Sequence, residues 1–214
     1  MSEAALSARL AGGVAGLGLN LSQQQQDQLL DYLGLLGKWN KVYNLTAVRD
    51  PGEMLTHHLL DSLAVIAPLR RYTEGRAIEL LDVGSGGGLP GVVVAICCSE
   101  IKVTCVDAVA KKAAFIQQSA TALALPNLRG VHARVESITQ QFDVVTSRAF
   151  ASLADFTQWS KGALAEQGVW MAMKGKHPDE ELASLSPEVS VFHVEQINVP
   201  GLDAERCIIW MRSR

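Results

Sequence analysis

The sequence lacks several features that would place it in a membrane, secreted or metal-binding class. No apolar run is long enough to span a bilayer, and the N-terminus has no basic segment followed by an apolar one. The four cysteines show no C-x-x-C spacing and have no histidines placed as a metal-ligand set: Cys97, Cys98, Cys105 and Cys207. We therefore expect a cytoplasmic protein with reduced cysteines, no membrane partner and no metal site.

An excess of basic residues is also missing. The formal net charge is -3 at pH 7 and the pI is about 5.9, whereas nucleic-acid-binding proteins usually carry a basic footprint. Composition alone argues mildly against an RNA partner, although a local basic patch can coexist with an acidic whole. The 214 residues, 48% of them hydrophobic, are enough for one sizeable globular core.

The most informative segment is a buried-strand pattern at 78–83 that runs directly into the glycine-rich sequence 84–91. Gly84, Gly86 and Gly88 form a G-x-G-x-G pattern that begins two residues after Asp82. Glycine lets the backbone turn sharply and approach a ligand closely. The next strand pattern ends in Asp107, whose carboxylate can accept hydrogen bonds from both hydroxyls of a ribose. This arrangement predicts a site for a nucleotide-containing cofactor.

Two cofactor classes compete for these glycines. Gly86, Gly88 and Gly91 also satisfy the G-x-G-x-x-G pattern of dinucleotide-binding folds. In those folds the first glycine of the pattern normally follows the strand directly, whereas here Gly84 holds that position. The acid before the first glycine and the acid closing the next strand resemble the S-adenosylmethionine-dependent methyltransferases of the Rossmann-like class. A turn that only packs a helix onto a strand is the alternative without a ligand.

The chain divides into a helical part and an alternating part. Ser22 with Gln25, and Asp50 with Pro51, are helix-start signals, the second of them ahead of a helix to residue 69. We expect residues 1–76 to form an N-terminal helical region packed on a domain at 77–214. Alternating patterns in that domain predict a mostly parallel, seven-stranded α/β sheet with helices on both faces and an antiparallel hairpin at its edge. The expected strands are 78–83, 102–107, 128–132, 142–146, 168–173, 189–196 and 207–211, and the expected helices are 90–98, 110–124 and 152–164.

Basic residues occur where several predicted strands end. In open α/β sheets these ends line the ligand site. We interpret Arg148 as a contact to the cofactor or to a target nucleotide, with a surface ion pair as the alternative. Lys174 and Lys176 are candidates for binding phosphate, and otherwise belong to a solvated turn. Phe150 either stacks on an exposed base or packs in the core.

Four segments together resemble a known family over essentially the whole chain. They are 38–46 (KWNKVYNLT), 58–63 (HLLDSL), 84–91 (GSGGGLPG) and 147–150 (SRAF). They are similar to the bacterial 16S ribosomal RNA guanine-N7 methyltransferases, first named glucose-inhibited division protein B. The resemblance implies a class I methyltransferase fold with an N-terminal helical extension. It also implies methyl transfer from S-adenosyl-L-methionine to N7 of one guanine near the decoding centre of 16S rRNA, in the small ribosomal subunit or its precursor.

The resemblance further implies roles for individual positions. Gly84 and Leu89 contact the cofactor at the glycine loop, and Val135 with Glu136 forms the loop beside the adenine. Together with the pattern above, the expected cofactor-binding residues are Asp82, Gly84, Gly86, Gly88, Leu89, Asp107, Val135, Glu136 and Arg148. The candidates for RNA binding are Arg148, Phe150, Lys174 and Lys176. The sequence departs from the family at Gly87, where many relatives have proline, and at His57, where arginine can occur.

We expect no catalytic base. Guanine N7 has an in-plane lone pair and no proton to lose, so the enzyme must only align it with the methyl group and exclude water. His58 and Asp61 lie three residues apart and can hydrogen-bond, but this chemistry does not require a dyad. The alternatives to an rRNA methyltransferase are a methyltransferase for small molecules or proteins, an RNA-binding module with a degenerate fold, and a dinucleotide-dependent oxidoreductase.

Overall fold

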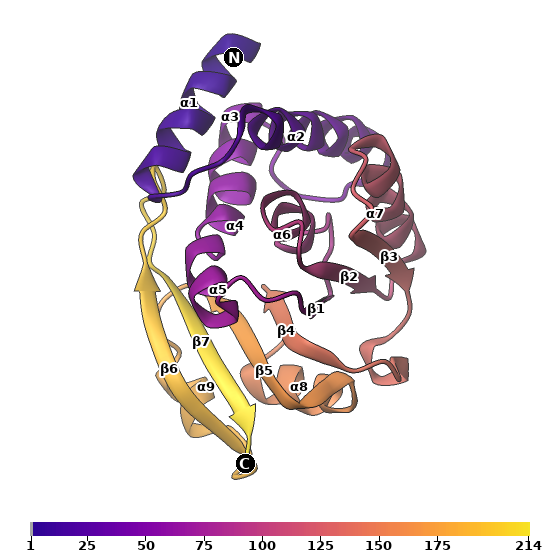
Figure 1. Ribbon diagram of the computed structural model, residues 1–214, viewed down its shortest axis with the longest axis vertical. Coiled ribbons are helices and arrows are strands. Elements are labelled where there is room, and N and C mark those ends of the chain that lie inside the picture. The colour runs from indigo at the N-terminus through magenta and orange to yellow at the C-terminus, as the bar shows by residue number, and fades with distance from the viewer. Residues whose placement is uncertain (1) are drawn as a thin grey trace.

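The computed structural model describes residues 2–214 and contains a seven-stranded sheet with helices on both faces (Figure 1). The strand order is β3-β2-β1-β4-β5-β7-β6. Neighbouring strands among the first five are parallel, whereas β7 is antiparallel to both β5 and β6. The predicted mostly parallel sheet with an edge hairpin is therefore confirmed. The strands are β1 Glu79–Val83, β2 Lys102–Asp107, β3 Leu128–His132, β4 Phe142–Arg148, β5 Leu164–Lys174, β6 Val189–Ile197 and β7 Arg206–Ser213.

The N-terminal region is helical, as predicted. Ser22 and Gln25 form the expected capping box at the start of α2, and Asp50 accepts hydrogen bonds from the first turn of α3. The helix expected to reach residue 69 is instead interrupted by a π-helical turn, η1, and by a break after α4. Helix α1 has no counterpart in the sequence prediction. The elements are α1 Glu3–Gly16, α2 Gln23–Tyr43, α3 Pro51–Met54, η1 Leu55–Leu60, α4 Asp61–Leu63 and α5 Ile66–Thr73.

The remaining helices follow individual strands. Helices α6 and α7 follow β1 and β2 as expected, whereas the helix predicted to reach residue 164 ends at Ser160 and is followed by η3 and by a β5 longer than predicted. These elements are α6 Gly91–Cys97, α7 Ala110–Ala122, η2 Val135–Ser137, α8 Leu153–Ser160, η3 Lys161–Ala163 and α9 Asp179–Ala183. Across residues 2–214, no helix has both the length and the apolar character needed to cross a membrane.

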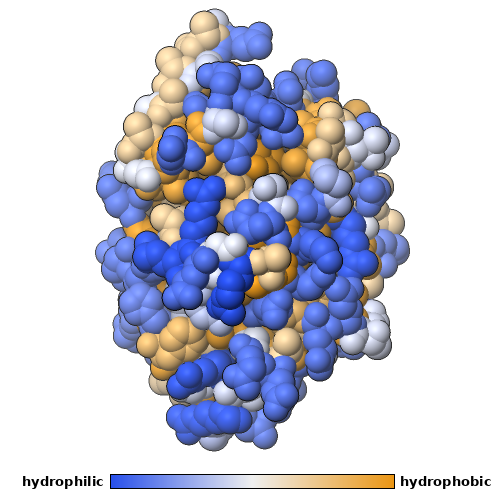
Figure 2. Space-filling view, viewed as in Figure 1, coloured by the Kyte–Doolittle hydropathy of each residue, from blue (hydrophilic) through white to orange (hydrophobic). Residues whose placement is uncertain are grey.

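Alternating strand side chains build a separate core on each face of the sheet. Leu80 belongs to a core that also contains residues of α1, α2, α5, α6 and α7, whereas its neighbour Leu81 belongs to a second core that contains residues of α8. This is the two-residue period of a strand that is buried on both faces. The N-terminal helices thus share one core with α6 and α7, and the domain boundary expected near residue 76 stays a prediction. Figure 2 shows that hydrophilic residues cover most of one face of the molecule, with apolar residues exposed among them mainly in its upper half.

Candidate functional site

The glycine loop between β1 and α6 has a backbone that only glycine suits at several positions. Gly84, Gly86 and Gly88 have φ angles of 61°, 59° and 86°, in the left-handed region. A β-carbon at Gly84 would lie 2.4 Å from the Phe150 ring, and one at Gly88 would lie 2.5 Å from Val92. The G-x-G-x-G pattern is therefore required both by backbone conformation and by close packing.

Asp82 supports the loop from beneath. Its carboxylate is fully buried, and Oδ2 accepts a hydrogen bond from the Gly91 N–H at 2.8 Å. Burial raises the Asp82 pKa to about 7, against a lowering by the Gly91 hydrogen bond and by Arg148. Because Asp82 occupies the N–H of Gly91, that donor at the start of α6 is not available to a ligand. The carboxylate ties the end of β1 to the beginning of α6.

Asp107 connects the same loop to the end of β2. Its Oδ2 accepts from the Gly86 N–H at 3.0 Å and its Oδ1 from the Val109 N–H at 2.8 Å. The Lys112 ammonium lies 3.8 Å from Oδ2. Each carboxylate oxygen has a second lone pair, so Asp107 can still accept hydrogen bonds from ribose hydroxyls.

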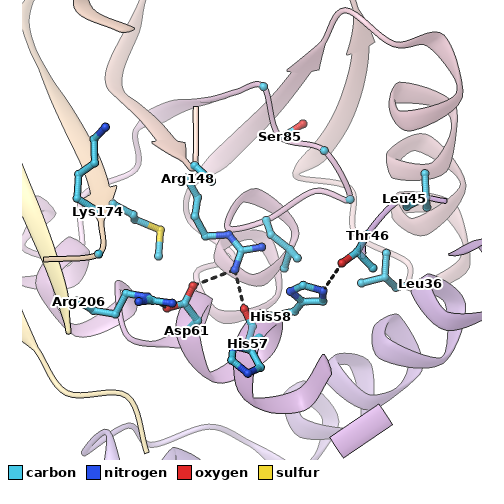
Figure 3. Close-up of a pocket in the computed structure, with 17 residues that line it drawn as sticks. Leu36, Leu45, Thr46, His57, His58, Asp61, Ser85, Arg148, Lys174 and Arg206 are labelled. Carbon is cyan, nitrogen blue, oxygen red and sulfur yellow. Dashed lines mark hydrogen bonds and ion pairs between the residues drawn. The ribbon is translucent and has the colours of Figure 1, made fainter. Parts of the chain in front are cut away.

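A cavity of about 560 Å³ opens beside the loop (Figure 3). Four of the expected cofactor residues line it: Gly84, Gly86, Leu89 and Arg148. Asp82, Gly88 and Asp107 lie in or behind the loop and do not line this cavity. Val135 and Glu136 form η2 after β3, with Val135 buried and Glu136 exposed, and also lie outside its wall. The N-terminal region completes the cavity with residues that include Leu36, Thr46, His58 and Asp61.

Arg148 is held inside the molecule. Its side chain is 19% exposed, and Nη1 donates to Asp61 Oδ2 at 2.9 Å and to the His57 carbonyl at 2.8 Å. The other oxygen of Asp61 accepts from Arg206 Nε at 2.7 Å. Arg148 thus forms an ion pair, but a largely buried one within the cavity wall. The spacing of His58 and Asp61 allows a hydrogen bond between them, but Asp61 instead pairs with these two arginines and His58 with Thr46.

The two lysines after β5 differ in their surroundings. Lys174 is 18% exposed, and its ammonium donates to Glu181 Oε2 at 2.7 Å and to the Ala151 carbonyl at 3.3 Å. Lys176 is exposed, and within residues 2–214 it makes no ion pair. A salt bridge therefore engages Lys174, while the Lys176 ammonium faces solvent.

Phe150 is partly buried and packs edge-on against Phe156 and Trp159, with ring centroids 6.3 Å and 5.8 Å apart. Its ring also covers Gly84, as the contact described above shows. Phe150 thus connects the glycine loop to the core formed with α8.

The sequence interpretation assigned no role to two residues that shape the site. The buried Tyr32 hydroxyl donates to the Gly87 carbonyl at 2.5 Å, so α2 holds the glycine loop directly. Tyr32 lies among the leucines of α2, and nothing in that pattern distinguishes it from an ordinary core residue. Arg206 begins β7, and an antiparallel strand brings its first residue to the edge where parallel strands end. The signal in the sequence is its position at the start of the last strand of the predicted edge hairpin.

Comparisons with known proteins agree with this architecture. A sequence model of the family described as rRNA small subunit methyltransferase G matches residues 25–209. The ribosomal RNA small subunit methyltransferase G of Polaromonas sp. (strain JS666 / ATCC BAA-500) is 70% identical over 209 residues, covering 96% of this chain and 92% of that protein.

Solved structures with low sequence identity share the fold. TrmN from Thermus thermophilus superimposes with a TM-score of 0.59 at 16% identity, over 75% of this chain and 53% of that chain. Coclaurine N-methyltransferase bound to N-methylheliamine and SAH gives a TM-score of 0.53 at 11% identity, over 91% of this chain and 66% of that chain. The predicted Rossmann-like methyltransferase fold is confirmed, and the chain belongs to the rRNA small subunit methyltransferase G family.

Proposed function

We propose that this protein transfers a methyl group from S-adenosyl-L-methionine to N7 of one guanine in 16S rRNA near the decoding centre. The substrate is the small ribosomal subunit or its precursor, and the enzyme acts in the cytoplasm. One observation carries the proposal: a glycine loop anchored by Asp82 and Asp107 opens onto a cavity that Arg148 and Arg206 also line. A cradle for a nucleotide cofactor therefore shares its cavity with basic side chains suited to RNA.

The residues around the loop fit S-adenosylmethionine. The backbone at Gly86 has open space beside it for close approach of a ligand, and Leu89 supplies apolar contact. We assign the ribose to Asp107, which holds the loop through the Gly86 N–H. We assign the adenine side to Val135 and Glu136. Within residues 2–214, two residues that line the cavity each have a buried polar atom without a hydrogen-bond partner: Ser85 Oγ and His58 Nδ1. Such atoms are rarely left unpaired, which supports a polar ligand beside them.

When bound, the cofactor supplies an electrophilic methyl group, and the protein has only to orient the acceptor. Burial and the neighbouring Arg148 lower the His58 pKa to about 4, which makes the imidazole a weak proton acceptor at physiological pH. Its Nε2 lies 2.8 Å from Thr46 Oγ1. Asp61 is engaged by two arginines. We therefore assign no general base, and attribute catalysis to orientation and exclusion of water.

The RNA-binding role divides among the candidates according to their surroundings. Arg148 lies in the cavity wall and positions the target nucleotide or the cofactor. Lys176 faces solvent and contacts phosphate, whereas Lys174 must first exchange its Glu181 partner. Phe150 supports the loop, and its remaining exposed part can stack on the target base.

The first test compares small-subunit RNA from cells with and without this gene. Chemical cleavage at N7-methylguanine should reveal one position that loses its signal when the gene is removed and regains it when the gene is restored. Identical cleavage patterns in both RNAs would refute the proposal. A changed position elsewhere in the ribosomal RNA would correct the target but retain the chemistry.

The second test asks whether methyl transfer needs a general base. Under single-turnover conditions with saturating RNA and cofactor, the methyl-transfer rate should be nearly flat from about pH 6 to 9, because no side chain has to accept a proton from guanine N7. Arg148→Ala should lower the rate without adding a pH dependence. A log-linear rise with pH that disappears in His58→Gln would show that a base takes part.

A further inference from the structure

The π-helical turn η1 directs a backbone carbonyl into the site. In an α-helix the N–H of Asp61 would donate to the carbonyl of His57, four residues earlier. Here the Asp61 N–H donates to the carbonyls of Thr56 and His58 and passes over His57. The His57 carbonyl instead accepts from Arg148 Nη1 at 2.8 Å. The irregular turn therefore provides a hydrogen-bond acceptor to the cavity, a local feature that is frequent at functional sites.

Asp61 provides two more acceptors at the end of the same turn. Its carboxylate is 4% exposed and lies between Arg148, 2.9 Å away at the end of β4, and Arg206, 2.7 Å away at the beginning of β7 (Figure 3). The N-terminal helices, the centre of the sheet and its edge hairpin thus meet at one buried carboxylate. Without that carboxylate, two guanidinium groups would face each other across a partly desolvated wall.

The arginines keep donors for a ligand. Within residues 2–214, every side-chain hydrogen bond of Arg148 leaves from Nη1, and those of Arg206 leave from Nε and Nη1. A guanidinium group has five N–H donors, so both side chains retain unused ones. Two arginines and one carboxylate also leave a formal charge of +1, which attracts a phosphate or an electron-rich base edge.

We propose that Asp61 is a positioning residue for methyl transfer. Asp61 fixes the guanidinium groups of Arg148 and Arg206, and the His57 carbonyl adds a second contact to Arg148, so that the free donors of both arginines face the nucleotide that receives the methyl group. The inference rests on the proposed function for the identity of that nucleotide. Asp61 itself does not contact the reacting atoms, and its effect reaches the RNA through the two arginines.

The kinetic test compares Asp61→Asn, Arg206→Ala and the double variant, with small ribosomal subunits as the substrate. Asp61→Asn should lower kcat/KM for the RNA by about 10- to 100-fold, the scale of losing correct orientation. Because the free donors of Arg148 face the nucleotide rather than the cofactor in this proposal, affinity for S-adenosylmethionine, measured by calorimetry without RNA, should change by less than about threefold. The double variant should lose little more than Asp61→Asn alone, because both changes disable the same unit. Asp61→Glu should recover part of the activity.

A matched control separates positioning from stability. Ile66→Val removes one buried methylene in α5, close in sequence to Asp61 but outside the site, and should leave kcat/KM unchanged well below its melting temperature. Thermal unfolding of each variant shows that assays use folded protein. If the fold-loss of kcat/KM in the double variant equals the product of the two single-variant losses, the inference is overturned. An Ile66→Val loss of kcat/KM as large as that of Asp61→Asn would also overturn it.

A second readout does not depend on activity. Phenylglyoxal modifies accessible arginines, and peptide mass spectrometry gives the rate at each one. Arg148 and Arg206 should react several times faster in Asp61→Asn than in the parent, while the exposed Arg212 should react at an unchanged rate. Unchanged rates at Arg148 and Arg206 would overturn the positioning role. A parent protein that methylates no RNA would instead refute the proposed function, and the arginine rates would still decide the role of Asp61.

Discussion

Replacing Asp82 by asparagine should change how the stability of the protein depends on pH. The Asp82 pKa is raised from 3.8 to about 7, mainly because the carboxylate is buried. The folded protein therefore retains a proton that the unfolded chain releases above about pH 4. Stability from this proton is fully present below the unfolded pKa and is lost as the pH rises through the folded one. An asparagine side chain stays neutral and can still accept the Gly91 hydrogen bond through its carbonyl oxygen.

The size of the effect follows from the two pKa values. Each pKa unit corresponds to about 1.4 kcal/mol, and between pH 5 and pH 7 the folded and unfolded states differ by nearly one proton. Over these two pH units Asp82 should therefore cost the parent roughly 2–3 kcal/mol in free energy of unfolding. Above pH 7 both states are deprotonated and the cost stops growing. The Asp82→Asn variant should not show this loss in free energy of unfolding, because its amide does not titrate.

Urea unfolding of both proteins at pH 5 and pH 8.5 measures the difference. The free energy of unfolding of Asp82→Asn minus that of the parent should be larger at pH 8.5 than at pH 5 by roughly 2–3 kcal/mol. Asp31→Asn serves as a control, because Asp31 is exposed on α2, and its difference from the parent should stay constant. A difference for Asp82→Asn that is equal at both pH values would show that the buried carboxylate does not hold its proton.

Three further predictions concern ligand binding. Tyr32→Phe removes the donor to the Gly87 carbonyl and should weaken S-adenosylmethionine binding by roughly 1–3 kcal/mol in calorimetry. The control Tyr72→Phe should leave the affinity unchanged. Equal affinities of Tyr32→Phe and the parent would show that Tyr32 does not support the cofactor site. Asp107→Ala should weaken the same binding by roughly 1–3 kcal/mol, and an unchanged affinity would exclude its ribose role. Lys176→Ala should reduce the slope of log RNA affinity against log salt by about one unit, and Lys174→Ala by less; a parental slope would return Lys176 to the solvated turn.

Much of the fold was accessible from the sequence because its signals are local. The predicted bounds of β2 and β3 match the structure, and β3 directly follows Pro126 and Asn127, two residue types that favour turns. Capping at Ser22 and Asp50 likewise depends on side chains within three residues of the helix start. Helix α1 and the π-helical turn η1 were missed. The apolar pattern of residues 54–69 cannot distinguish an α-helical turn from a π-helical one, because the choice depends on which groups the turn meets in space.

The sequence by itself therefore determined the family, the mostly parallel sheet with its edge hairpin and the glycine loop, all of which rest on residue type and short spacing. Only the tertiary structure decided how the charged groups are used. Asp61 meets Arg148 and Arg206, which lie 87 and 145 residues away in the chain, and Lys174 meets Glu181 across a turn. The Asp82 pKa depends on desolvation by the surrounding core. Ion pairing and proton affinity are set by distance and dielectric environment, and both arise only when distant segments pack together.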